Sequence, residues 1–183
     1  MTTTMALDLN DYLPSVADFP RPGVVFRDIG PLLASPQAFA QAIDGLATAA
    51  AARTFTRIAG IESRGLIFAA ALALRLGKPL VPVRKPGKLP PPTVRAAYAL
   101  EYGSDALEIQ STALHAGESA LIVDDVIATG GTVLATAQLV RQLGGQVAGV
   151  AAILEIGFLG GGDRLRAAGL SVRALLTASP APR

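Results

Sequence analysis

The stretch ALIVDDVIATGGTVLATAQLV, residues 120–140, places two adjacent aspartates at the end of an apolar run and follows them at once with Ala-Thr-Gly-Gly-Thr. The apolar run predicts a buried strand over 120–124, and the small residues predict a loop over 125–131. Apolar residues at helical spacing then predict a helix over 132–143. Such an order is typical of α/β folds, which bind ligands at the carboxyl ends of parallel strands.

The rest of the chain repeats this alternation, so the sequence predicts one α/β domain over residues 1–183, a twisted and mainly parallel sheet flanked by helices. Strands are expected at 57–61, 79–83, 120–124, 146–154 and 170–176, with a helix at 66–77. Residues 84–110 begin with basic, Gly and Pro residues and at first show neither helical nor strand periodicity. This favours a mobile loop or β-flap over about 86–106. No domain boundary is expected.

Composition excludes several classes of protein. The 183 residues are 51% hydrophobic and 16% charged, which suits one sizeable core. No cysteine is present and His115 is the single histidine, so disulfides, thiolate metal sites and multi-histidine sites are excluded, and a cytoplasmic location is expected. No apolar run reaches the roughly 18 residues of a membrane span, so no membrane partner is expected. A net charge of +2 gives no argument for nucleic acid.

The loop after the strand has the composition of a phosphate cradle, formed by Ala128, Thr129, Gly130, Gly131 and Thr132. Small residues let several backbone N–H groups and a helix N-terminus converge on one phosphate. Neither the Walker spacing nor the dinucleotide G-x-G-x-x-G is present, which disfavours nucleoside triphosphate hydrolysis. A sugar with a vicinal diol and one phosphate would satisfy both the loop and the two aspartates. The alternative is a solvated turn with an Asp cap.

The segment LIVDDVIATGGT (121–132) resembles the phosphoribosyl diphosphate signature of the type I phosphoribosyltransferases. Residues 22–33, 60–73, 83–90 and 98–110 resemble the adenine phosphoribosyltransferase family, in that order. The resemblance implies the type I phosphoribosyltransferase fold and transfer of the 5-phosphoribosyl group from phosphoribosyl diphosphate to adenine, a purine salvage reaction that forms AMP and diphosphate with Mg²⁺. It also implies a homodimer.

The same resemblance implies roles for individual residues. Asp124 and Asp125 would hold the ribose hydroxyls, with Mg²⁺ near them through water, and residues 128–132 would hold the 5′-phosphate. The residues implied for diphosphate are Ser63, Arg64, Arg84, Lys85 and Lys88; those for adenine are Val25, Phe26 and Arg27. Diphosphate as a leaving group requires cations, so the basic residues fit this role chemically. Phe26 taken alone could equally be an ordinary core aromatic.

The reacting purine must exchange a proton, for which one positioned carboxylate suffices. Glu101 matches the family's catalytic acid or base on the flap, and Tyr102 the aromatic residue that closes over the site. Arg64 is predicted to act with them in catalysis, as a cation that neutralises the departing diphosphate. Without the resemblance, Glu101 would be interpreted as a solvated loop charge. His115 matches no motif and is expected on the surface.

The chain also departs from the family pattern. After the strand that ends in AAILEI, the family usually carries a Gly-Arg pair, whereas this chain continues with GFLGGGDRL (157–165). Two alternative functions stay open: a phosphoribosyltransferase for another base, such as xanthine or guanine, and a non-enzymatic regulator that senses phosphoribosyl diphosphate. The segments VVFRDI and LEYG distinguish the first, and an added basic face would be needed for the second.

Overall fold

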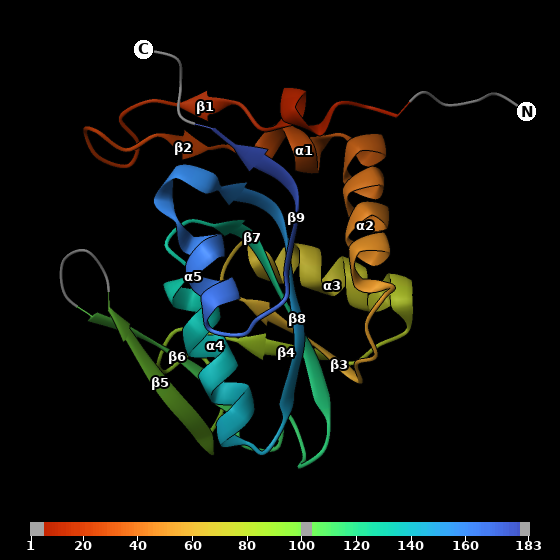
Figure 1. Ribbon diagram of the computed structural model, residues 1–183, viewed down its shortest axis with the longest axis vertical. Helices are drawn as coiled ribbons and strands as arrows, with labels where there is room; N and C mark the ends of the chain where they lie inside the picture. The colour runs from red at the N-terminus through yellow and green to blue at the C-terminus, as the bar shows by residue number, and fades with distance from the viewer. Residues whose placement is uncertain (1–5, 100–103, 180–183) are drawn as a thin grey trace, which may run out of the picture. The chain divides into compact units, whose positions relative to one another are not determined.

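The structure is a computed structural model that describes residues 6–99 and 104–179 (Figure 1). The chain divides into two compact units, residues 1–45 and 46–183, which are described here one at a time. The division falls inside one continuous helix, α2 (Pro36–Ala50), rather than in a linker.

The second unit is built on a five-stranded sheet in the order β4-β3-β7-β8-β9, in which all neighbours are parallel. Its strands are β3 (Arg57–Ile61), β4 (Leu80–Val83), β7 (Ser119–Ile127), β8 (Gln146–Ile156) and β9 (Val172–Ala178). The central strands β3, β7 and β8 are almost continuously buried, as expected for a parallel sheet covered on both faces. The predicted parallel sheet is confirmed.

Helices connect these strands, namely α3 (Gly65–Leu76), α4 (Gly131–Gln142) and α5 (Gly161–Ala167), the last preceded by the 3₁₀ turn η2 (Gly157–Leu159). The chain moves from β3 outward to β4, but from β7 it moves in the opposite direction to β8 and β9. Because such crossovers are right-handed, α3 covers one face of the sheet, and α4 and α5 cover the other (Figure 1). The direction therefore reverses between β3 and β7, where α/β folds bind ligands.

The segment expected to form a β-flap contains an antiparallel hairpin of β5 (Thr93–Ala99) and β6 (Ser104–Gln110). It packs against α4, with Leu107 and Ile109 fully buried in the core. The two strands agree with the β-flap interpretation, but they extend to Gln110 and not to 106, because Leu107 and Ile109 continue β6 into the core. Residues 100–103 lie outside the described part of the chain.

One boundary of the opening motif was predicted wrongly. The strand does not end at 124 but continues to Ile127, because Val126 and Ile127 extend the pairing with Leu154 and Glu155 of β8. Both aspartates therefore lie within β7, and the connecting loop is only residues 128–130 before α4 begins at Gly131. The β-branched Val126 and Ile127 suit a strand, which is the signal that the loop prediction overlooked.

The first unit contains short elements: the 3₁₀ helix η1 (Leu9–Tyr12), the antiparallel pair β1 (Ser15–Val16) and β2 (Phe26–Arg27), and helix α1 (Gly30–Ala34). Pro31 and Pro36 stand in the first turns of α1 and α2, where a missing N–H group costs nothing. Among the residues that the structure describes, no helix has both the length and the apolar character that crossing a membrane demands.

Candidate active site

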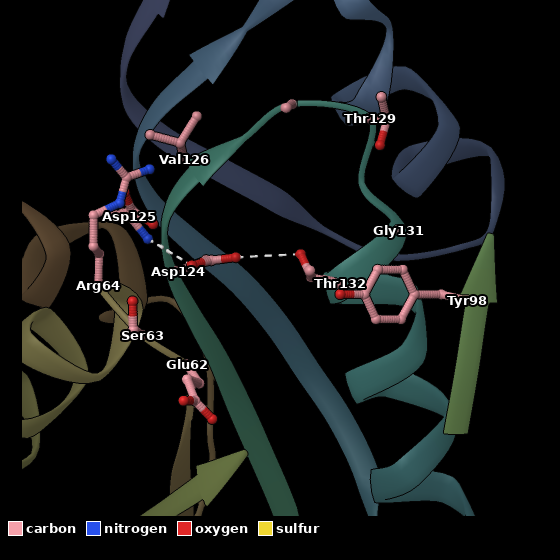
Figure 2. A pocket seen from close by; sticks show the side chains of 11 residues that line it. Glu62, Ser63, Arg64, Tyr98, Asp124, Asp125, Val126, Thr129, Gly131 and Thr132 are labelled. Atoms are coloured by element: carbon pink, nitrogen blue, oxygen red, sulfur yellow. Dashed lines mark hydrogen bonds and ion pairs between the residues drawn. The ribbon is translucent and has the colours of Figure 1, made fainter. Parts of the chain in front are cut away.

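A cavity of about 360 Å³ opens at the carboxyl ends of β3 and β7, at the point where the direction of the chain reverses (Figure 2). Residues of the turn after β3, of the end of β7, of the start of α4 and of β5 line it: Glu62, Ser63, Arg64, Tyr98, Asp124, Asp125, Val126, Ala128, Thr129, Gly131 and Thr132. The cavity lies wholly within the second unit.

The two aspartates of β7 are neighbours in the chain but have different partners. Asp124 accepts a hydrogen bond from Thr132 Oγ1 at the start of α4 (3.3 Å). Asp125 Oδ2 lies 2.7 Å from Arg64 Nε in the turn before α3. Figure 2 shows the resulting divergence, Asp124 toward Thr132 and Asp125 toward Arg64. Alternation of side chains along a strand gives the two carboxylates different partners, and both still border one cavity.

Both carboxylates are nearly inaccessible to solvent, with 6% of Asp124 and 5% of Asp125 exposed. Burial, and next the charge of Asp125, raise the pKa of Asp124 well above its usual range. Hydrogen bonds from Asp125 N–H (2.9 Å) and Thr132 oppose this shift without cancelling it. A buried acid pair of this kind favours a ligand that brings hydroxyl donors or positive charge.

Gly65 lets the turn after β3 approach β7 this closely. A Cβ atom there would lie 2.6 Å from Asp124 Oδ1 and 2.9 Å from Asp124 Cα. Any side chain would therefore push the start of α3 away from the aspartates, and Arg64 with it. Glycine at this position therefore lets the turn ESRG (62–65) lie against the two aspartates of β7.

The loop between β7 and α4 has the form expected of a phosphate cradle. Gly130 adopts a left-handed conformation (φ +79°) and serves as the N-cap of α4 without a side-chain hydrogen bond. The first N–H groups of the 12-residue helix are thus left for a ligand, and the helix dipole favours an anion there. Four of the five predicted phosphate residues, Ala128, Thr129, Gly131 and Thr132, line the cavity, and Gly130 lies between them.

The five residues proposed for diphosphate do not all reach the cavity. Ser63 and Arg64 line it, whereas the lining includes none of Arg84, Lys85 and Lys88. Arg84 donates to Glu62 from Nε (2.9 Å), and this hydrogen bond lowers the pKa of Glu62. Lys88 is exposed on the loop after β4.

Lys85 is bound by the hairpin. Its ammonium group donates to Tyr98 Oη (3.1 Å) and pairs with the carboxylate of Asp105. Burial alone would lower the pKa of Lys85, but the hydrogen bonds with Asp105 and Tyr98 outweigh it, and the pKa is raised. Lys85, which follows β4, thus connects the end of that strand to β5 and β6.

Sequence reasoning missed three residues of the cavity wall, Glu62, Tyr98 and Val126. In Figure 2 the ring of Tyr98 extends from β5 toward Thr132 at the start of α4, and it packs on the core. Only the register of the hairpin places it there, and the sequence gives no signal for that register. Val126 could have been found by extending the strand past the aspartates.

The residues proposed for adenine belong to the first unit, where Phe26 and Arg27 form β2. Val25 is 56% exposed. The ring of Phe26 meets that of Phe19 edge to face (centroids 5.1 Å apart), and Arg27 donates to Ser15 Oγ (2.8 Å). Phe26 is half-buried, not an ordinary core aromatic.

Glu101 and Tyr102, the residues predicted for proton transfer and closure, lie outside the described residues. His115 is exposed in the turn before β7, which confirms its assignment to the surface. Within the described ranges 6–99 and 104–179, no group of three or more His, Asp or Glu side chains could hold a metal ion by itself.

A family model described as the phosphoribosyl transferase domain matches residues 32–164. The chain is therefore a member of the phosphoribosyl transferases and has their fold. An adenine phosphoribosyltransferase from Streptomyces coelicolor is 53% identical over 164 residues, which cover 88% of this chain and 90% of the relative.

Solved structures agree with this relationship. An adenine phosphoribosyltransferase from Thermoanaerobacter pseudethanolicus superposes with a TM-score of 0.89 at 44% identity, over 93% of this chain and 98% of the other. The enzyme from Saccharomyces cerevisiae, complexed with an imino-altritol bisphosphate and adenine, gives 0.85 at 41% identity, over 92% and 96%. The chain belongs to the adenine phosphoribosyltransferase family, which confirms the resemblance seen in its motifs.

Proposed function

We propose that this chain transfers the 5-phosphoribosyl group from phosphoribosyl diphosphate to adenine, forming AMP and diphosphate in purine salvage. The observation that carries the proposal is the cavity between β3 and β7, where a phosphate loop at the start of α4 faces two buried aspartates and Arg64. The family relationship supports adenine as the base, since the relatives from Streptomyces coelicolor and Saccharomyces cerevisiae are both adenine phosphoribosyltransferases.

Each part of the cavity suits one part of the sugar substrate. The N–H groups at the start of α4 and the hydroxyl of Thr132 would bind the 5′-phosphate. Asp124 and Asp125 would accept hydrogen bonds from the ribose hydroxyls, which relieves the cost of their burial. Arg64 and Ser63 would hold the diphosphate as it leaves, and cations placed where charge develops lower the barrier most.

The remaining roles rest on the family pattern. Glu101 would exchange a proton with the base as the ribosyl centre moves from diphosphate to adenine, and Tyr102 would exclude water from the activated sugar. Val25, Phe26 and Arg27 would form the base slot. Arg84, Lys85 and Lys88 would join the diphosphate site only after the first two leave their present acidic partners.

The proposal includes a magnesium ion, because the residues that line the cavity fit one. Two carboxylates border one cavity, and buried Asp125 Oδ2 accepts no hydrogen bond from the described residues, its contact with Arg64 being an ion pair. Mg²⁺ is commonly held by one or two carboxylates, partly through water, together with substrate oxygens. When bound, it would neutralise charge on the diphosphate. We also propose a cytoplasmic location, which the lack of cysteine supports, and a homodimer, by analogy with the family.

The test is a product assay. The purified chain is incubated with phosphoribosyl diphosphate, Mg²⁺ and one of adenine, guanine, hypoxanthine or xanthine, and nucleotides are separated by chromatography. We expect AMP from adenine, loss of product with a chelator, and recovery when Mg²⁺ is added back. Product from guanine or xanthine in preference to adenine would establish the other-base transferase instead. Tight binding of phosphoribosyl diphosphate with no product from any base would favour the regulator.

A further inference from the structure

The loop GFLGGGDRL, in which the chain departs from its family, lies beneath the phosphate loop. A Cβ atom at Gly161 would overlap the carbonyl oxygen of Ala128 and would lie 2.8 Å from the nitrogen of Gly130. Seen from the other side, a Cβ atom at Gly130 would lie 3.1 Å from the carbonyl oxygen of Gly161. The two backbones are therefore in direct contact, with no room for a side chain between them.

Helix α5 adds a second contact to the same loop. Leu165 is fully buried, and its Cγ atom would be 3.2 Å from a Cβ atom on Gly130. Gly161 thus supports the first residue of the loop, Ala128, and Leu165 supports Gly130, the left-handed N-cap residue of α4. The loop has α5 behind it and the cavity in front of it.

We infer that Gly161 is a positioning residue for the 5′-phosphate site. Its lack of a side chain lets α5 hold the Ala128 carbonyl and the Gly130 N–H in the one arrangement in which the loop amides face the phosphate. The inference rests on the proposed role of residues 128–132 in phosphate binding. A displacement of about 1 Å in such a loop is enough to weaken the site strongly.

The neighbouring glycine offers a matched control. A Cβ atom at Gly162 would overlap Glu155 Oε1, a carboxylate that is 8% exposed and is paired with Arg166 Nη2 (2.7 Å). Gly162→Ala therefore disturbs the same turn of α5 and a partly exposed ion pair, but not the contacts with the phosphate loop. Gly157→Ala is the mild control, because its Cβ atom would meet Thr177 Cγ2 at 3.3 Å and Ala178 O at 3.5 Å.

The experiment compares steady-state kinetics, ligand affinity and thermal stability of Gly161→Ala, Gly162→Ala and Gly157→Ala. Gly161→Ala should raise the KM for phosphoribosyl diphosphate by about 10- to 100-fold and weaken ribose 5-phosphate binding equally, with the affinity for inorganic diphosphate unchanged. Gly162→Ala should lower the melting temperature at least as much, with KM within about twofold of the parent. If Gly161→Ala does not fold, Leu165→Ala should show the same KM effect.

Two results would overturn the inference. In the first, Gly161→Ala or Leu165→Ala melts early but keeps the parent KM and the parent affinity for ribose 5-phosphate. In the second, Gly162→Ala raises KM as much as Gly161→Ala, which would reveal a general effect of destabilising α5. Thr132→Val separates these outcomes from failure of the proposed function: if it too leaves ribose 5-phosphate binding unchanged, residues 128–132 are not the phosphate site at all.

Discussion

Removal of Arg64 should destabilise the protein and reduce its activity for separable reasons. Arg64→Ala leaves the Asp125 carboxylate without the cation that lies 2.7 Å away, and only 8% of the Asp125 side chain is exposed. Breaking a fully buried pair costs about 3–5 kcal/mol, whereas an exposed pair contributes about 0–1 kcal/mol. Since 32% of the Arg64 side chain is exposed, water can enter when it is removed, and we expect an intermediate loss of about 2 kcal/mol.

Urea unfolding measures this loss. With a slope of about 2 kcal/mol per M, the unfolding midpoint of Arg64→Ala should fall by about 1 M. The double variant Arg64→Ala, Asp125→Asn should recover most of the difference, because the amide carries no charge that must be paired. Arg141→Ala, which removes an exposed arginine from the last turn of α4, is the control and should shift stability by less than about 0.5 kcal/mol.

The catalytic activities of these variants should not follow the order of their stabilities. Loss of a positioned donor from a developing anion lowers kcat by about 10² to 10³, so Arg64→Ala should be impaired by that factor. The double variant should be nearly as stable as the parent and still impaired, because restoring charge balance does not restore the cation. A parent-like urea midpoint for Arg64→Ala would refute the buried-pair argument, and parent-like turnover in the double variant would refute the catalytic role.

Three further predictions concern other parts of the site. Gly130→Val, at a left-handed residue with Gly161 O and Leu165 close to its Cβ position, should abolish phosphoribosyl diphosphate binding in calorimetry while the circular dichroism spectrum is retained; undiminished affinity would contradict the cradle. Glu101→Gln should lower turnover by about 10² to 10⁴ with substrate affinities within a few-fold, and parent-like turnover would make Glu101 a solvated charge. The hydrogen bond from Arg84 lowers the pKa of Glu62 below 4.5, so its stabilisation is complete above that value and is lost as the pH falls through the folded-state pKa. The urea midpoints of parent and Glu62→Gln should therefore differ at neutral pH and converge as the pH falls through the folded-state pKa, and a constant difference would show that this pair does not titrate.

The sequence predicted those features that depend on neighbouring residues. A strand followed by two aspartates, small residues and a helix predicts from local sequence alone that Asp124, Asp125 and Thr132 lie at one edge of the sheet. The structure places them there. The end of β7 was misplaced because the run of small residues after Ile127 outweighed the β-branched pair before it. Pairing with β8, a contact remote in sequence, decides that boundary.

Other features depend on contacts that no local pattern encodes. The ion pair between Arg64 and Asp125 joins residues 61 positions apart, and it exists because Gly65 permits a close approach of the backbone. Tyr98 reaches the cavity only through the register of the hairpin. The three glycines of GFLGGGDRL are visible in the sequence, but a glycine in a sequence does not reveal which backbone it touches.

Three of the four proposed diphosphate cations are paired with an acid in the structure. Arg64 pairs with Asp125, Arg84 with Glu62, and Lys85 with Asp105. A ligand phosphate must therefore exchange with a carboxylate rather than meet an unpaired charge, and the free energy of binding is the difference between two pairings. Such an exchange releases a carboxylate each time a cation turns to the diphosphate. Asp125 lies at the cavity wall and Asp105 on the hairpin. If Arg64 and Lys85 both bind the diphosphate as proposed, its binding would therefore change contacts of β7 and of β6.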